Sequence, residues 1–280
     1  MKYLITSILL LFFLVSCKSE PLKYRIKWDL KEGNLVSYEA VVSQIELDQN
    51  FKTHGYKVFD DDEVRNKIKA SLRSLKRPIA TMEAKLSPSA NGFRAKFVTT
   101  KPTYENLPEN DEEKLKREAL ASQAGTVEVL ADISFSGELQ SFYLKQKQRN
   151  LVSLFFKLPE EPISIGDKWS IPIDLIEIGQ GFVPSEAKRK QEVELQSVSK
   201  NDQGHEIADI FYIITEMVEG QFEYSYTDEV VPIKSEYTYY ALGKFNLQAG
   251  RWEDFVAISY ISGAGTSVSE NMMVHSLKLK

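Results

Sequence analysis

The sequence predicts an α+β fold that is mainly antiparallel β: a curved sheet, an open barrel or a sandwich, with about three helices. Three observations lead to this prediction. Many segments alternate polar and apolar residues with the period of two that is typical of strands. Short turns rich in Gly, Asn, Asp and Ser separate these segments. Three windows instead repeat their apolar residues with the spacing of a helix.

The first strand patterns lie close to the N-terminus. Residues 23–30 alternate, and a turn at 32–34 leads into a second alternating segment over 35–47, which together predict a hairpin. Two further hairpins are expected within 80–99 and 127–144, each with a short turn in the middle. The apolar face of the first segment consists of Tyr24, Ile26, Trp28 and Leu30.

Helices are expected near residues 62–76, 111–124 and 149–158. The first begins at the acidic cluster of residues 60–63, where the helix dipole favours negative charge, and it ends before Pro78. Reading this cluster as a calcium site is disfavoured, because it lacks the alternating spacing and the distal glutamate of such loops. The middle helix has a thin apolar stripe, so its prediction depends on the capping pair Asn110 and Glu113.

The C-terminal half has the most regular pattern, and short turns join its strands in sequence, as in an antiparallel meander. The strands around Tyr239 and Phe255 carry apolar side chains on both faces. Strands of this kind are covered on both faces, so helices or a second sheet are expected to pack outside this sheet. The expected strands are 191–199, 206–217, 234–247, 251–262 and 266–279.

The N-terminus carries the pattern of an export signal. A short positive start precedes an apolar run from Leu4 to Val15, which is too short to cross a bilayer as a helix. The residues Leu14-Val15-Ser16-Cys17 resemble the lipobox of bacterial lipoproteins, in which lipid is attached to the cysteine and the preceding peptide is removed. The resemblance implies a signal peptide over 1–16, lipidation at Cys17 and a lipidated tether over 17–22. An ordinary secretory signal with an incidental cysteine, or an uncleaved anchor, is the alternative.

The residue after the cysteine bears on localisation. Lys18 stands where lipoproteins retained on the inner membrane often carry aspartate, which favours the outer membrane. No long acidic run follows, so the periplasmic face is expected. Removal of residues 1–16 leaves 264 residues (280 minus 16), enough for the single β-rich domain that we expect over 23–280. The formal net charge of −5 shows no basic face for nucleic acid.

Motifs for catalysis, metals and cofactors do not appear in the sequence. His54, His205 and His275 lack the spacing of a metal-binding helix, and the sequence has no HExxH. It has no G-x-S-x-G elbow, and the small residues 262–267 lack the lysine of a phosphate-binding loop. Cys17 is the only cysteine and is assigned to lipidation. We therefore expect no enzyme, no metal and no cofactor, although carboxylates paired in space remain open.

Residues 158–169, Leu-Pro-Glu-Glu-Pro-Ile-Ser-Ile-Gly-Asp-Lys-Trp, resemble a Gly-Asp-x-Trp motif of uncharacterised β-rich envelope lipoproteins. The segment from Gly243 to Arg251 is similar to a turn in the same group, with Asn246 where aspartate is common. The resemblance implies an envelope protein, and the group has no assigned activity. Trp169 is expected to pack inward as a core residue, because a buried tryptophan most often serves packing.

Two functions remain open. The first is non-catalytic binding of an apolar ligand or lipid inside a curved sheet, and this resembles, by analogy, open-barrel envelope proteins that carry lipids or lipoproteins. The second is a scaffold that holds an envelope protein near the membrane through exposed aromatic side chains. The residues that would bind the ligand are unknown at this level.

Overall fold

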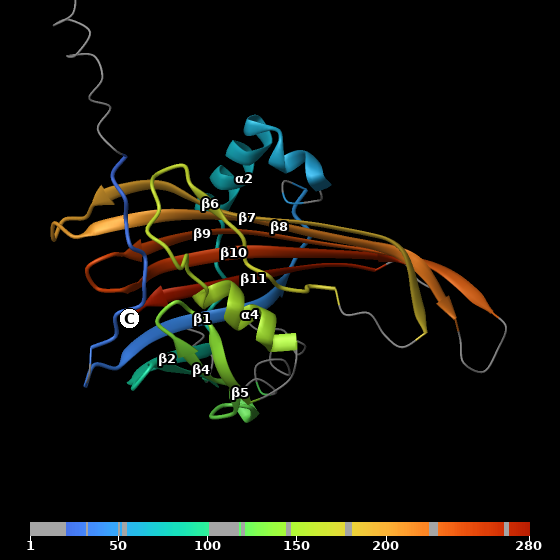
Figure 1. Ribbon diagram of the computed structural model, residues 1–280. Helices are drawn as coiled ribbons and strands as arrows, with labels where there is room; N and C mark the ends of the chain where they lie inside the picture. The colour runs from blue at the N-terminus through green and yellow to red at the C-terminus, as the bar shows by residue number, and fades with distance from the viewer. Residues whose placement is uncertain are drawn as a thin grey trace, which may run out of the picture.

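The computed structural model describes residues 21–31, 33–49, 51, 55–100, 118, 121–143, 147–176, 181–223, 229–265 and 269–280. It contains one curved, unclosed sheet of eleven strands (Figure 1). Every pair of neighbouring strands is antiparallel, which confirms the predicted class. The strands are β1 (Val36–Ile45), β2 (Met82–Ser89), β3 (Gly92–Thr99), β4 (Val127–Ser134), β5 (Leu139–Tyr143), β6 (Lys168–Trp169), β7 (Phe182–Lys200), β8 (Glu206–Glu223), β9 (Val230–Asn246), β10 (Arg251–Ala264) and β11 (Ser269–Leu279).

The first strand of the chain lies in the middle of the sheet, and so does the last. Strands β1 to β5 step to one edge, the chain crosses to the other edge through the helix α4 (Lys147–Phe156), and β6 to β11 step back until β11 pairs with β1. The first and last strands therefore meet at the centre. The two edge strands, β5 and β6, lie at opposite ends of the strand order, and α4 lies in the region between them (Figure 1).

The inner face of the sheet, on which α4 packs, carries the larger core. Aromatic side chains from the strands, from α4 and from residues 26–30 fill it. The ring centroids of Trp28 and Phe93 lie 4.9 Å apart, and those of Phe155 and Phe255 lie 5.2 Å apart. Contacts at these distances and angles add to the stabilisation that burial itself provides. The fully buried members include Trp28, Phe93, Phe97, Phe155, Phe156, Phe245, Trp252 and Phe255.

Two tryptophans anchor the C-terminal end of α4 within this core. The indole nitrogen of Trp28 donates to the carbonyl of Phe156 at 2.9 Å, and that of Trp252 donates to the carbonyl of Phe155 at 2.7 Å. The last carbonyls of a helix have no partner within the helix. The two indoles therefore satisfy polar groups that would otherwise be buried and unpaired.

The outer face carries a second, smaller core under the helix α2 (Asp62–Ser74) and the 3-10 turn η1 (Gly55–Phe59). Asp61 caps α2, since its side chain accepts from the backbone of Glu63 and Val64. Ile68 and Leu72 of α2 are buried against the sheet. The acidic cluster thus starts a helix, as predicted, and the predicted cover on both faces of the C-terminal strands consists of α4 inside and α2 outside.

Charged contacts as well as apolar ones hold α2 against the sheet. Arg65 is 6% exposed and pairs with Glu192 at 2.7 Å and with Glu194, both on β7. Lys69 donates to Gln196 at 2.8 Å and lies over the ring of Phe211. Breaking a buried ion pair leaves an uncompensated charge, so these contacts fix where α2 sits on the sheet.

The hairpin predicted at the N-terminus is wrong. Residues 23–30 form no strand; Tyr24 makes one isolated bridge to Ile163, and the backbone of Trp28 and Asp29 donates to Phe135 and Gly250. The alternation itself is correct, because Ile26, Trp28 and Leu30 are buried together. The segment has its apolar face in the inner core and distributes its backbone hydrogen bonds among three separate elements. Periodicity predicts which residues are buried, but it cannot predict this choice of partners.

The number of helices also needs correction. The described residues contain two α-helices, α2 and α4, where the sequence predicted about three. Both lie close to the ranges expected for them. Of the third, expected over 111–124, only residues 118 and 121–124 are described, and 118, 121 and 122 among them are helical.

Strands β7 to β10 run beyond the rest of the sheet as an extension (Figure 1). We define the extension as residues 182–187, 218–223, 230–235 and 262–264. Strands β7, β8 and β9 have 19, 18 and 17 residues, which corresponds to lengths of about 55–65 Å. The described chain begins, in blue, at the opposite end of the sheet (Figure 1).

Replacing Trp252 with Phe should destabilise the protein by about 1–3 kcal/mol in urea unfolding, because the carbonyl of Phe155 loses its donor while remaining buried. Trp169→Phe provides the control. Trp169 is half-buried, and its indole nitrogen has no partner among the described residues, so we expect a loss below about 1 kcal/mol. Equal losses in the two variants would contradict the anchoring role of the Trp252 indole.

Candidate functional site

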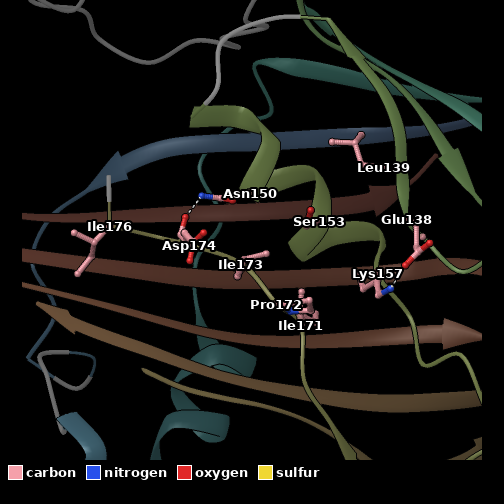
Figure 2. A pocket seen from close by; sticks show the side chains of 11 residues that line it. Glu138, Leu139, Asn150, Ser153, Lys157, Ile171, Pro172, Ile173, Asp174 and Ile176 are labelled. Carbon is pink, nitrogen blue, oxygen red and sulfur yellow. Dashed lines mark hydrogen bonds and ion pairs between the residues drawn. The ribbon is translucent and has the colours of Figure 1, made fainter. Parts of the chain in front are cut away.

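A groove lies in the region between the two edges of the sheet, with α4 along one side. We call it the seam groove; its volume is about 500 Å³. The turn between β4 and β5 borders it at one side, and residues 171–176, which follow β6, border it at the other (Figure 2). It is lined by Gly137, Glu138, Leu139, Asn150, Ser153, Lys157, Ile171, Pro172, Ile173, Asp174 and Ile176.

The β4–β5 turn reaches α4 because of a glycine. Gly137 has a φ of 82°, in the left-handed region, and a Cβ there would lie 1.6 Å from the carbonyl oxygen of Phe156. Only glycine allows both this backbone shape and this approach. The backbone nitrogen of Leu158 then donates to the carbonyl of Ser136 at 3.0 Å. The turn is thereby fixed against the end of α4.

Polar contacts hold the two ends of the groove (Figure 2). At one end, the side-chain amide of Asn150 on α4 donates to the carbonyl of Asp174. At the other, the ammonium of Lys157 lies 2.7 Å from Glu138 and 3.3 Å from Glu160. Lys157 lowers the pKa of Glu138 through this hydrogen bond, so the Glu138 carboxylate is ionised at neutral pH. Both walls are therefore tied to α4.

The groove combines these polar ends with apolar atoms along its length. Leu139 and Ile176 are half-buried, and Pro172 is exposed. The buried side chains of Ile171 and Ile173 point away into the inner core. Among the lining residues, no histidine or cysteine stands beside Ser153, and the charge of Lys157 is compensated by its two carboxylates. This surface can bind a molecule that has both polar and apolar parts.

A second group of polar side chains lies on the inner face, beyond the aromatic core. We call Tyr212, Tyr237, Tyr239, Ser259 and His275 the buried polar cluster. Ser259 hydrogen bonds to Nε2 of His275 at 2.9 Å and also to Tyr237. The ring of Tyr239 lies 5.9 Å from the His275 ring. Burial lowers the pKa of His275 to about 4, so its imidazole is neutral at physiological pH.

Three polar atoms of this cluster have no hydrogen-bond partner among the described residues: Oη of Tyr212, Oη of Tyr239 and Nδ1 of His275. Burial also raises the pKa of both tyrosines, which keeps their hydroxyls protonated. Tyr240, on the outer face, likewise has an unpaired hydroxyl. Buried polar groups are usually paired, so each of these atoms needs an explanation.

The residues singled out in the sequence differ in whether the structure describes them and in how deeply they are buried. Cys17 and His54 lie outside the described residues, and lipidation at Cys17 stays a prediction. Trp169 is half-buried and packs against the inner core, so its contact is structural, although less deep than that of Trp28 or Trp252. His205 lies beside a turn, where its backbone donates to Asn201.

The sequence predicted neither the seam groove nor the buried polar cluster. Nothing in the sequence links Asn150 with Asp174, since only the crossing of α4 between the edges brings them together. His275 stands alone in the sequence, and its neighbours Ser259 and Tyr239 come from two other strands. The period of two could have placed each on the inner face, but register decides that they meet.

Comparison with known proteins places the chain in no group: no protein family matches it, no curated protein resembles it, and no solved structure matches its fold. Within the described ranges, neither helix combines the length and the apolar character needed to span a membrane.

His275 should make stability depend on pH. Its pKa is about 4 when folded and about 6.5 when unfolded, so the unfolded state gains a proton first as the pH falls. Stability is therefore lost between pH 6.5 and pH 4, by about 2–3 kcal/mol between pH 7 and pH 4.5. His275→Gln should lack this part of the loss in urea unfolding at the two pH values, while the carboxylates, common to both proteins, contribute equally. The same pH dependence in both proteins would contradict the assignment.

Proposed function

We propose that this chain is a lipid-anchored protein of the bacterial cell envelope that binds an amphiphilic ligand of the lipid class without catalysis. The seam groove is the observation that carries the proposal. Its volume of about 500 Å³ falls within the range of small-molecule sites. It offers hydrogen-bonding groups on Asn150, Ser153 and Lys157 next to the apolar atoms of Leu139, Pro172 and Ile176. A ligand with a polar group and a hydrocarbon part matches both.

Binding, and not turnover, is the role that this chemistry supports. A nucleophile needs a base that is hydrogen bonded to it, and the described lining residues include no histidine to serve as the base for Ser153. The ammonium of Lys157 is already engaged in ion pairs with Glu138 and Glu160. The side chains that remain can position a ligand by hydrogen bonds and contact.

The proposed anchor gives the molecule an orientation. Lipid on Cys17 would hold the chain at the outer membrane, and we place it on the periplasmic side. Each buried methylene of the lipid contributes about 0.8 kcal/mol, so two or three chains are a stable anchor. The described chain begins, in blue, at the end of the sheet away from the extension, so the extension would point away from the membrane (Figure 1).

The extension supports a second candidate, a scaffold that binds an envelope protein. The side chains of Val183 and Val230 are 52% and 48% exposed there. A hollow of about 750 Å³ crosses the four strands, with Gly220 and Ile233 in its lining. Strands with exposed apolar residues on a projecting sheet are a suitable surface for a partner protein. This candidate and ligand binding concern different sets of lining residues and can be tested separately.

Filling the seam groove should prevent ligand binding. Ser153 is half-buried on the groove side of α4, and Ser153→Trp would place an indole where the ligand lies. We expect lipid retained by the natively purified protein, measured by mass spectrometry, to fall by about tenfold, equivalent to about 1.4 kcal/mol. Ser74→Trp, at the exposed end of α2, is the control and should retain lipid as the unmodified chain does. Unchanged retention in Ser153→Trp would contradict the site.

The anchor has its own test. Replacing Cys17 with Ala removes the thiol that the lipid would occupy, so the protein should move from the detergent phase to the aqueous phase in detergent partitioning. A variant that still partitions fully into detergent would show that lipidation at Cys17 is wrong.

A further inference from the structure

The buried polar cluster surrounds two alanines in one cross-strand row of the inner face. Tyr212 pairs with Ala241, Ala241 pairs with Ala257, and Ala257 pairs with His275. Two methyl groups therefore lie between a tyrosine and a histidine. Larger rings border the row on its two sides, Tyr239 in one neighbouring row and Phe255 in the other.

The side chains around this row carry polar atoms that have no hydrogen-bond partner among the described residues. Oη of Tyr212, Oη of Tyr239 and Nδ1 of His275 are buried without a hydrogen-bond partner among the described residues. The two tyrosines are near enough for Tyr212 to influence the ionisation of Tyr239, and the ring of Tyr239 lies 5.9 Å from His275. Three unsatisfied groups in one place are unusual in a folded protein. They indicate a binding partner that brings acceptor atoms.

The surroundings select an uncharged partner. Burial alone shifts the pKa values of Tyr212 and His275, with no contribution from a nearby charge. A carboxylate or phosphate buried here would have no cation to compensate it, and burying an isolated anion is strongly unfavourable. A neutral carbonyl oxygen needs no counter-ion and accepts hydrogen bonds from hydroxyl and imidazole N–H groups.

We propose that Tyr212, Tyr239 and His275 bind the neutral ester carbonyl of an acyl lipid. The proposal assigns the His275 tautomer: Nε2 accepts from Ser259 at 2.9 Å, and the proton on Nδ1 is the third donor beside the two tyrosine hydroxyls. This inference rests on the proposed function, because it assigns the ligand class that the seam groove and the cluster share.

The groove and the cluster are connected through one carboxylate. The backbone nitrogens of Leu175 and Ile176, at one end of the groove, donate to Glu216 at 2.7 and 3.3 Å. Glu216 pairs across the strands with Tyr237, a member of the cluster. Glu216 therefore contacts both the segment that borders the groove and the strand that carries the cluster.

Competition between two lipids tests the proposal. The unmodified protein is incubated with equal amounts of 1,2-dioleoylglycerol, which has ester carbonyls, and its dialkyl ether analogue, which has none, and the bound ratio is measured by native mass spectrometry. We expect a preference for the ester of about tenfold, since up to three hydrogen bonds are lost with the ether. The Tyr212→Phe/Tyr239→Phe double variant should bind the two lipids about equally.

Tyr240→Phe is the matched control, because it removes another buried, unpaired hydroxyl of the same strand on the outer face. It should keep the ester preference. The double variant should also melt no lower than the unmodified chain, since it removes only unpaired hydroxyls. A lower melting temperature would instead indicate that ordered water already satisfies them, and would overturn the proposal.

The remaining outcomes separate the two proposals. If the unmodified protein binds both lipids equally, or if the double variant keeps the preference, the ester site is wrong while lipid binding stands. If the unmodified protein binds neither lipid, lipid binding by this chain is wrong, and the ester site falls with it.

Discussion

Two indole N–H groups fix the position of α4, and the interior of the molecule depends on this contact. Trp28 and Trp252 donate to the carbonyls of Phe156 and Phe155, neighbouring groups at the end of the helix that the helix itself cannot satisfy. The two tryptophans lie far apart in the sequence, one near each end of the described chain. One contact therefore joins the N-terminal segment, the crossing helix and the start of β10, and the aromatic core forms around it.

An unclosed sheet follows from the path of the chain. Because β1 pairs with β11 at the centre, the strands with exposed edges are β5 and β6, and α4 connects them across the inner face. One side of α4 packs into the inner core, and another side faces the region between the two edge strands. The second side, with Asn150, Ser153 and Lys157, forms the seam groove. The candidate site is thus a consequence of the topology, since a closed barrel would have no such seam.

The long C-terminal strands need cover on both faces, and the two covers differ in chemistry. The inside is aromatic and holds the buried polar cluster, whose histidine is neutral because burial opposes its charge. The outside is a smaller apolar core under α2, positioned by Arg65 between two glutamates. Beyond both covers the strands continue as the extension, where apolar side chains such as Val183 remain exposed.

The sequence by itself determined the mainly antiparallel class, nearly all strand positions, the helices around Ile68 and Phe155, and the two-sided burial of the C-terminal strands. These are local properties: period, capping and turn residues act within a few positions of the chain. Only the tertiary structure decided that residues 23–30 cross between elements, that the sheet stays open, and that Asn150 meets Asp174. It also decided that His275 meets Ser259 and Tyr239. Such contacts depend on register and on the path of distant segments, and a single sequence without its strand pairing contains no distance between them.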